Sequence, residues 1–363
     1  MRDLPPPPAP LALLAELTHR CPLACPSCSN PLELVAREGE LDTATWARVF
    51  AEAADLGVLQ LHLSGGEPAA RRDLPELVAA ARQAGLYVNL ITSGIGLSEA
   101  RLDALEAAGL DHVQLSLQGV RAGIADRIGG YRGGFDRKLQ VARAITARGL
   151  PLTLNAVMHR QNLDDLAETI AFAADLGARR IEVACVQFYG WAQRNRAALL
   201  PTRAQVEAAK RTVAEALQTY RGLMAIDFVP PDYYADYPKA CMGGWGSTGL
   251  NVAPDGTVLP CHAAATIPGL SFQRVTETPL AEIWTHGPVF QAFRGHDWMQ
   301  EPCRSCARRD IDHGGCRCQA MALAGDPRAT DPVCRHAPHR PLVDALLADL
   351  PADDVLPEFV YRR

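Results

Sequence analysis

Three cysteines lie close together near the start of the sequence, where Cys21, Cys25 and Cys28 form the array C-x3-C-x2-C. A structural zinc site usually has four protein ligands. Three thiolates instead suit a cubane iron–sulfur cluster, in which one iron atom is then left without a protein ligand. A zinc knuckle with a distant fourth ligand, or three incidental cysteines, are the alternatives. The array therefore favours a cluster with an open iron atom.

A second motif, SGGEP, occupies residues 64–68. Gly65 and Gly66 would let the backbone approach a ligand closely, and the Glu67 carboxylate can accept from an ammonium group. An open iron can bind the amine and carboxylate of S-adenosylmethionine, and one electron then releases the 5′-deoxyadenosyl radical. Alone, such a motif is more often a simple turn, but beside the cysteine array it favours this cofactor.

Seven further cysteines crowd the last third of the chain, at Cys241, Cys261, Cys303, Cys306, Cys316, Cys318 and Cys334. Seven thiolates are one short of two four-ligand sites, so another residue contributes or one position stays open. Asp312 is a candidate, because five residues separate it from Cys306 and three separate it from Cys316. A pair of zinc sites is the alternative interpretation of this region.

Composition limits the function classes. Eleven cysteines without a recognisable secretory signal indicate metal binding in a reducing, cytoplasmic compartment rather than disulfides. We interpret the N-terminal stretch as an extended arm leading into a first strand. The net charge of −5 gives no indication of nucleic acid as a partner, and no apolar run approaches the roughly 20 residues that span a membrane.

The elements that would position these motifs alternate between strands and helices. Apolar strands are predicted at 11–18, 58–66, 87–94, 112–119, 150–158 and 179–187, each followed by a helical pattern, near 46–57, 73–84, 98–108, 134–148, 162–176 and 202–219. Such repeats predict an α/β fold with a parallel sheet, as an open partial barrel or a doubly wound sheet. Both architectures gather function at the carboxyl ends of the strands. We expect a core over 1–225, a cysteine-rich domain over 226–345 and a tail over 346–363.

The cysteine array, GGEP and the strand series together resemble the radical S-adenosylmethionine superfamily, over roughly residues 10–220. The resemblance implies a partial (β/α)6 barrel with a 4Fe-4S cluster on Cys21, Cys25 and Cys28. It also places residues around the cofactor: Gly65, Gly66 and Glu67 at the methionine amine, Ser116 and Arg127 on the carboxylate and ribose side, and Asn155 on the rim. Ser27 departs from the family, which usually has an aromatic residue before the third cysteine.

The cysteine-rich end resembles the SPASM extension of the same superfamily, which binds two auxiliary clusters. This likeness implies two ligand sets. Auxiliary site I would use Cys241, Cys261, Cys316 and Cys318. Auxiliary site II would use Cys303, Cys306, Asp312 and Cys334. One cluster would be 4Fe-4S and the other 2Fe-2S or 4Fe-4S.

Three longer strings, AELTHRCPLACPSCSNP, YGWAQRNRAALLPTR and DIDHGGCRCQA, are similar to the family that acts in pyrroloquinoline quinone biosynthesis. Membership would imply a carbon–carbon cross-link between a glutamate γ-carbon and a tyrosine ring carbon in the precursor peptide PqqA. It would also imply the peptide chaperone PqqD as a separate partner and a flavodoxin-type electron donor.

Residues after the sixth strand are candidates to line a peptide channel, namely Tyr189, Trp191, Asn195 and Arg196; packing beneath a loop is the alternative. Two other functions stay open at this point. One is a different SPASM peptide maturase, forming thioethers, acting in mycofactocin maturation or activating sulfatases. The other, from a different class, is a non-catalytic zinc-binding adaptor.

Overall fold

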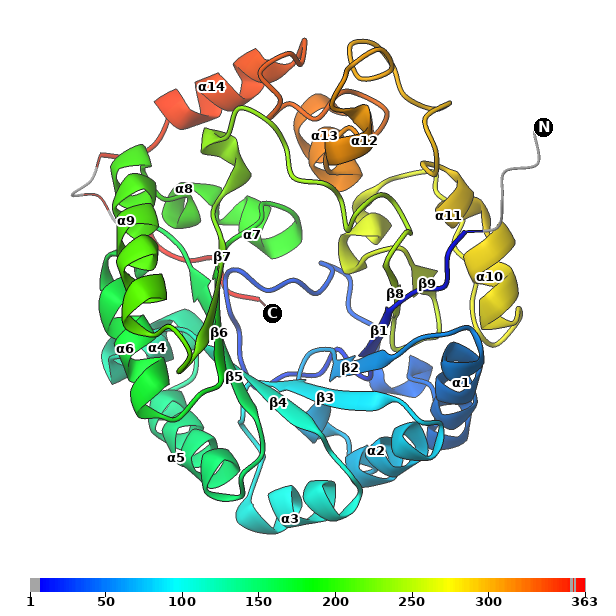
Figure 1. Cartoon of the computed structure of the whole chain (residues 1–363), viewed down its shortest axis with the longest axis vertical. Coiled ribbons are helices and arrows are strands. Elements are labelled where there is room, and N and C mark those ends of the chain that lie inside the picture. The colour runs from blue at the N-terminus through cyan, green and yellow to red at the C-terminus, as the bar shows by residue number, and fades with distance from the viewer. Residues whose placement is uncertain (1–6, 353–354, 356, 363) are drawn as a thin grey trace.

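The computed structural model describes residues 7–352, 355 and 357–362, so residues 1–6 of the expected N-terminal arm lie outside the described residues (Figure 1). Within them one sheet runs in the order β7-β6-β5-β4-β3-β2-β1-β8-β9. Neighbouring strands are parallel except for β9, which is antiparallel to β8. The strands are β1 (Ala12–Glu16), β2 (Gln60–Ser64), β3 (Tyr87–Thr92), β4 (His112–Leu117), β5 (Leu152–Met158), β6 (Arg180–Cys185), β7 (Ala225–Val229), β8 (Gly249–Val252) and β9 (Val258–Leu259).

The strand order decides between the two architectures left open by the sequence. A doubly wound sheet reverses its strand order at a switch point, whereas β1 to β7 follow one another without reversal. Figure 1 shows these strands curving around a common centre, with the helices outside. The fold is therefore a partial barrel, and this prediction of fold class is confirmed.

Most helices cover the outer face of the sheet, whereas α7 lies on the inner side of β7 (Figure 1). The helices that connect consecutive strands of the barrel are α1 (Thr43–Asp55), α2 (Leu74–Gln83), α3 (Glu99–Ala107), α4 (Ala122–Gly129), α5 (Gly134–Ala147), α6 (Leu166–Asp175), α7 (Gly190–Arg194), α8 (Arg196–Leu199) and α9 (Arg203–Thr219). The C-terminal region adds short helices: α10 (Leu280–His286), α11 (Pro288–Gln291), α12 (Arg309–Asp312), α13 (Arg317–Ala324) and α14 (Arg340–Ala348). Short 3-10 turns connect several of these elements: η1 (Arg37–Gly39), η2 (Pro68–Ala70), η3 (Leu163–Asp165), η4 (Asp232–Tyr234) and η5 (His262–Thr266).

Alternation along the strands separates an apolar outer face from a polar inner one. Leu61, Leu63 and Leu90 are fully buried in the core formed with the helices. The residues of opposite parity face the barrel interior and form a polar row across the strands. In that row the Asn89 amide lies 3.0 Å from His62 Nδ1, and the Gln114 amide donates to Glu182 at 2.8 Å. The barrel interior is thus suited to polar ligands rather than to a continuous apolar core.

The sheet also contains strands that the sequence pattern did not predict. β7 pairs with β6 in parallel register, and β8 pairs with β1, aligning Leu13 with Leu250. Strands from both sides of the expected boundary near residue 225 therefore belong to one sheet. β1, which leads into the cysteine array, lies between β2 and β8.

Candidate metal centres

The loop that carries Cys21, Cys25 and Cys28 follows β1 at the carboxyl edge of the sheet. It is fixed by backbone contacts: Leu17 N–H donates to Ser64 at 2.9 Å, and Ala24 N–H donates to Gly129 at 2.8 Å. The loop therefore stands between the end of β2 and the end of α4, at the open mouth of the barrel.

The three thiols of this loop lie close enough to influence one another electrostatically. Burial raises the pKa of Cys21 to about 11, that of Cys25 to about 12, and that of Cys28 above its ordinary value. Without metal the sulfur atoms are thus neutral thiols at physiological pH, and a metal group would have to displace their protons. Three converging thiols with no fourth cysteine on the loop fit a cluster that keeps one open iron.

Close backbone approach explains the two glycines of GGEP. A Cβ on Gly65 would lie 2.2 Å from the Thr18 carbonyl oxygen, and one on Gly66 would lie 2.4 Å from that of Arg20. Gly66 and Glu67 N–H groups donate to these same carbonyls, at 2.5 and 2.7 Å. The motif is therefore held against the residues that immediately precede Cys21.

The Glu67 side chain forms structural hydrogen bonds that the sequence pattern did not predict. It is buried, and its two oxygens accept from Ala69 N–H (2.9 Å), Thr92 Oγ1 (2.7 Å), Ser93 N–H (2.7 Å) and Ser93 Oγ (2.5 Å). An ionised carboxylate has about four acceptor positions, so these donors fill them. Glu67 thus connects the end of β3 to the GGEP turn, and its expected contact with a methionine amine stays a prediction.

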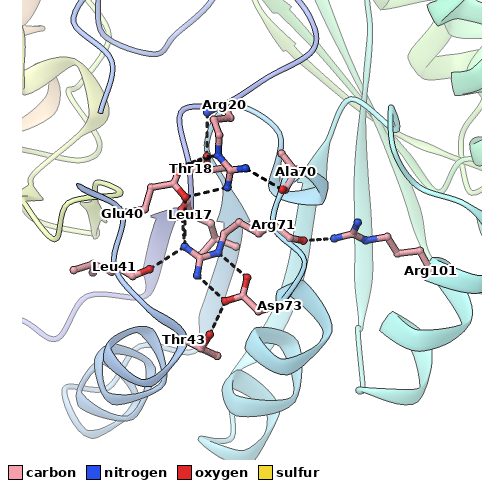
Figure 2. A network of polar contacts seen from close by, with 10 residues as sticks. All are labelled: Leu17, Thr18, Arg20, Glu40, Leu41, Thr43, Ala70, Arg71, Asp73 and Arg101. Atoms are coloured by element: carbon pink, nitrogen blue, oxygen red, sulfur yellow. Dashed lines mark hydrogen bonds and ion pairs between the residues drawn. The ribbon is translucent and has the colours of Figure 1, made fainter. Parts of the chain in front are cut away.

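A polar network below the cysteine loop ties the same segments together (Figure 2). The Arg20 guanidinium binds both oxygens of Glu40, at 3.1 and 3.0 Å, and donates to the Ala70 carbonyl at 3.2 Å. Arg71 is buried and donates to the Leu17 carbonyl (3.2 Å) and to Asp73 (2.6 Å). The network links the start of the loop to the turn after GGEP, and it fixes the relative position of the two motifs.

The other residues expected around the cofactor lie on the mouth and the inner face of the barrel. Ser116 accepts from the ammonium group of Lys138 through its carbonyl, at 3.0 Å, and Asn155 donates to Glu182 at 2.9 Å. Arg127 is exposed near the end of α4 and donates to Gln161 at 2.8 Å. Ser116 and Asn155 therefore belong to the sheet, and Arg127 belongs to the rim.

Lys138 is a charged group near the loop that the sequence analysis missed. It is buried, and burial lowers its pKa to about 8, while the nearby Cys25 and Glu67 act in the opposite direction. Its place on the same face of α5 as Val141, Ala142 and Ile145, which are buried, was the available signal. Lys138 brings a positive charge to the side of the loop that faces β4.

The four residues expected to line a peptide channel do not share one location. The Tyr189 hydroxyl hydrogen-bonds His262, and Trp191 is buried and donates to Pro31 at 3.3 Å. Asn195 is buried and donates to the Pro26 carbonyl at 3.1 Å. Arg196 begins α8 and acts electrostatically on Tyr233. Trp191 and Asn195 thus support the cysteine loop, whereas Tyr189 lies toward the C-terminal cysteines.

Cys241, Cys261, Cys316 and Cys318 come together around the start of α13. Thiol hydrogen bonds join Cys316 to Cys241 and to Cys318, and another joins Cys318 to Cys261. The two donors lower the pKa of Cys316 well below its ordinary value, whereas donation and burial raise the pKa of Cys241 and Cys318. The structure thus brings together the four residues expected for auxiliary site I.

Cys303, Cys306, Asp312 and Cys334 line a second position, a cavity of about 240 Å³. Three successive left-handed residues precede Cys316: His313 (φ 50°), Gly314 (φ 73°) and Gly315 (φ 80°). They turn the chain between Asp312 and Cys316, which belong to different groups. Within the described part of the chain, no three His, Cys, Asp or Glu side chains are placed to hold a single metal ion.

Comparisons with known proteins agree with this arrangement. Residues 15–173 match the family model of the radical SAM superfamily, and residues 241–307 match that of SPASM, an iron–sulfur cluster-binding domain. The chain is 71% identical to the PqqA peptide cyclase of Ruegeria pomeroyi over 98% of its own length and 95% of the relative. It is 62% identical to that of Rhizobium meliloti, over 96% and 93%.

The chain belongs to the PqqA peptide cyclase family. Membership confirms the predicted radical SAM core, the SPASM extension and the assignment as an enzyme of pyrroloquinoline quinone biosynthesis. Among solved structures, Streptococcus suis SuiB bound to S-adenosylmethionine superimposes with a TM-score of 0.76 at 21% identity, covering 90% of this chain and 78% of SuiB. That likeness shows that the family shares its fold with SuiB. No helix in the described ranges has the length and apolar character needed to cross a bilayer.

Proposed function

We propose that this chain joins a glutamate γ-carbon to a tyrosine ring carbon within PqqA. The observation that carries the proposal is the identity of 57–71% to relatives named PqqA peptide cyclase, over more than nine-tenths of both lengths. The local geometry supports it, because the three thiols of the cysteine loop stand at the barrel mouth, where a peptide can approach.

In this proposal Cys21, Cys25 and Cys28 hold the cluster, and the backbone of Gly65 and Gly66 borders the methionine end of the cofactor. Cluster and S-adenosylmethionine together supply the 5′-deoxyadenosyl radical when bound. Glu67 contributes indirectly, because it keeps the ends of β2 and β3 at a fixed separation. The polar row inside the barrel would accommodate the ribose and the peptide.

The reaction balances as an oxidation by two electrons. One hydrogen atom would pass from the glutamate γ-carbon to the 5′-deoxyadenosyl radical, giving 5′-deoxyadenosine, and the resulting carbon radical would add to the ring carbon beside the phenol oxygen. One carbon–carbon bond forms there. Loss of one electron and one proton from the ring then restores aromaticity, so the peptide loses two hydrogens in total. The electron needs an acceptor, and auxiliary iron–sulfur clusters are suitable acceptors.

Two auxiliary clusters would occupy the two groups of C-terminal ligands. Site I comprises Cys241, Cys261, Cys316 and Cys318. Site II comprises Cys303, Cys306, Asp312 and Cys334. One of the two clusters would be 4Fe-4S and the other 2Fe-2S or 4Fe-4S. A carboxylate in place of a thiolate would alter the charge at site II and therefore the potential of its cluster.

The proposal also includes partners and a compartment. PqqD would present PqqA to the barrel mouth, and a flavodoxin-type protein would deliver electrons. Because reduced thiols are needed at all three sites, we place the reaction in the cytoplasm.

An anaerobic incubation tests the function directly. The reconstituted chain, a reductant and S-adenosylmethionine are combined with PqqA and PqqD, and the peptide is analysed by mass spectrometry. We expect loss of two hydrogens and fragment ions that keep the glutamate and the tyrosine joined. Loss of carbon dioxide or a thioether would assign the chain to another SPASM maturase, and a colourless zinc protein without iron or sulfide would indicate an adaptor.

A further inference from the structure

The C-terminal segment returns to the barrel mouth. After α14 the chain turns back, and Figure 1 shows its end near the centre of the ring of strands. We refer to residues 357–362 as the tail. Exposure alternates along it: Glu358 and Val360 are exposed, Phe359 and Tyr361 are half-buried, and Arg362 is buried at 8% exposure. One side of the tail therefore faces the protein.

The Asn195 side chain forms two hydrogen bonds to the backbone of one tail residue, as a neighbouring β-strand would. Its amide donates to the Val360 carbonyl at 2.8 Å, and its carbonyl accepts from Val360 N–H at 2.7 Å. The same amide group donates to Pro26, inside the cysteine loop, at 3.1 Å. Asn195 is 3% exposed, so these hydrogen bonds are shielded from water. The tail and the loop thus share one buried anchor.

Aromatic contacts fix the neighbouring residues of the tail. The Phe359 ring meets His159 edge-on at 5.9 Å, and the Arg127 guanidinium lies 4.9 Å from its centre. The Tyr361 hydroxyl donates to the Arg127 carbonyl at 2.8 Å. Arg127, expected at the cofactor, therefore also contacts the tail, with energies of about 1 kcal/mol for such pairs.

Arg362 reaches the cysteine loop itself. Its N–H donates to the Ala24 carbonyl at 3.1 Å, between Cys21 and Cys25, and its guanidinium donates to the His19 carbonyl. The guanidinium also lies close enough to the Cys21 and Cys28 thiols to act on them electrostatically. A buried guanidinium is costly unless a negative group compensates it, and three metal-bound thiolates would provide that charge.

We propose that the tail is a permanent part of the radical-generating site and that Arg362 is a positioning residue for the cluster. The backbone and guanidinium of Arg362 fix the loop at two carbonyls, and its charge stands beside the thiolates. This inference rests on the proposed binding of a cluster by Cys21, Cys25 and Cys28. A positive charge beside a cluster favours its reduced form, which is the form that cleaves S-adenosylmethionine.

Arg362→Gln removes the charge and keeps hydrogen-bonding capacity, and Arg362→Lys keeps the charge. Arg335→Gln is the control, because Arg335 is exposed and pairs only loosely with Asp236, at 3.7 Å. Each full-length protein is reconstituted anaerobically and its iron content is measured. The first cluster is then titrated by electron paramagnetic resonance, followed through the signal that changes when S-adenosylmethionine is added.

For Arg362→Gln we expect the reduced-to-oxidised ratio at a fixed potential to fall about tenfold, which is about 59 mV for one electron. Arg362→Lys should stay within threefold of the parent, and the control should match it. An unchanged potential and iron content in Arg362→Gln would overturn the inference. So would faster 5′-deoxyadenosine formation after removal of residues 357–363, because the tail would then be a plug.

The same experiment distinguishes a failure of this inference from a failure of the proposed function. If the parent protein shows no signal that responds to S-adenosylmethionine, the proposed function fails, and this inference fails with it. If the parent responds and the Arg362 variants do not differ from it, only the inference is wrong.

Discussion

The substitution Glu67→Gln tests whether the Glu67 carboxylate stabilises the fold or binds S-adenosylmethionine. Gln keeps the shape of the side chain, but its amide nitrogen would face the N–H of Ser93, now 2.7 Å from a carboxylate oxygen. A buried donor without an acceptor costs about 1–3 kcal/mol. The hydrogen bonds from Thr92 and Ala69 would also lose their charge assistance, about 1 kcal/mol each. We therefore expect a loss of about 3–5 kcal/mol in the free energy of unfolding.

The assay is urea unfolding of the iron-free protein, followed by circular dichroism, with S-adenosylmethionine binding to the reconstituted protein measured separately. Glu168→Gln is the control, because its side chain is 56% exposed and surface substitutions usually change stability by less than about 0.5 kcal/mol. If Glu67→Gln unfolds at the same urea concentration as the parent but binds S-adenosylmethionine tenfold more weakly, the carboxylate is a ligand contact and our interpretation of its hydrogen bonds as structural is wrong.

Three further predictions concern the metal sites. Cys28→Ala should abolish 5′-deoxyadenosine formation, measured by chromatography. The control Cys185→Ala, in the core of the sheet, should retain it. Full production by Cys28→Ala would contradict the assignment of the loop as a cluster site. Asp312→Ala should preserve 5′-deoxyadenosine formation but reduce the amount of cross-linked peptide at least tenfold. The control Asp310→Ala, at a side chain that is 65% exposed, should leave the amount of cross-linked peptide unchanged. Equal product and unchanged spectra in Asp312→Ala would exclude Asp312 as a ligand. In the iron-free protein the pKa of Cys21, raised from 9.0 to about 11, predicts slow alkylation at pH 8 that accelerates toward pH 11. Because the folded state holds this proton to a higher pH than the unfolded state, the free energy of unfolding should also fall as the pH rises through 9 toward 11; rapid labelling at pH 8 in mass spectra would refute the shift.

The sequence was sufficient for the strands whose pattern is local. β1 to β6 are short apolar runs followed by helical repeats, and all six fall inside their predicted ranges. β7 was not predicted because it is a half-exposed edge strand directly before two prolines. β8 was not predicted because it has only four residues and lies in turn-rich sequence. The pairing of β8 with β1 joins segments more than 200 residues apart, and no local pattern records such a contact.

In the site, too, contacts between residues close in the sequence were predictable, whereas contacts between distant residues were not. Spacing alone grouped Cys21, Cys25 and Cys28, whose thiols lie near one another because the turns between them are short and local. The two C-terminal ligand sets came from the resemblance to SPASM, because their members are far apart in the sequence. The connection formed by Glu67 depends on Thr92 and Ser93, which belong to the next strand. The contact from Arg362 to His19 crosses 343 positions and depends on the course of the whole chain.

The pairing of β1 with β8 affects how the protein unfolds. Two domains joined by a linker can melt separately, but here the strand leading to the cysteine loop is hydrogen-bonded on one side to the C-terminal region. We expect one cooperative melting transition for both regions. A fragment ending near residue 225 would expose the free edge of β1, and such edges pair with other chains. Expression of the barrel alone should therefore yield aggregates, so dissection of this enzyme requires point substitutions in the intact chain.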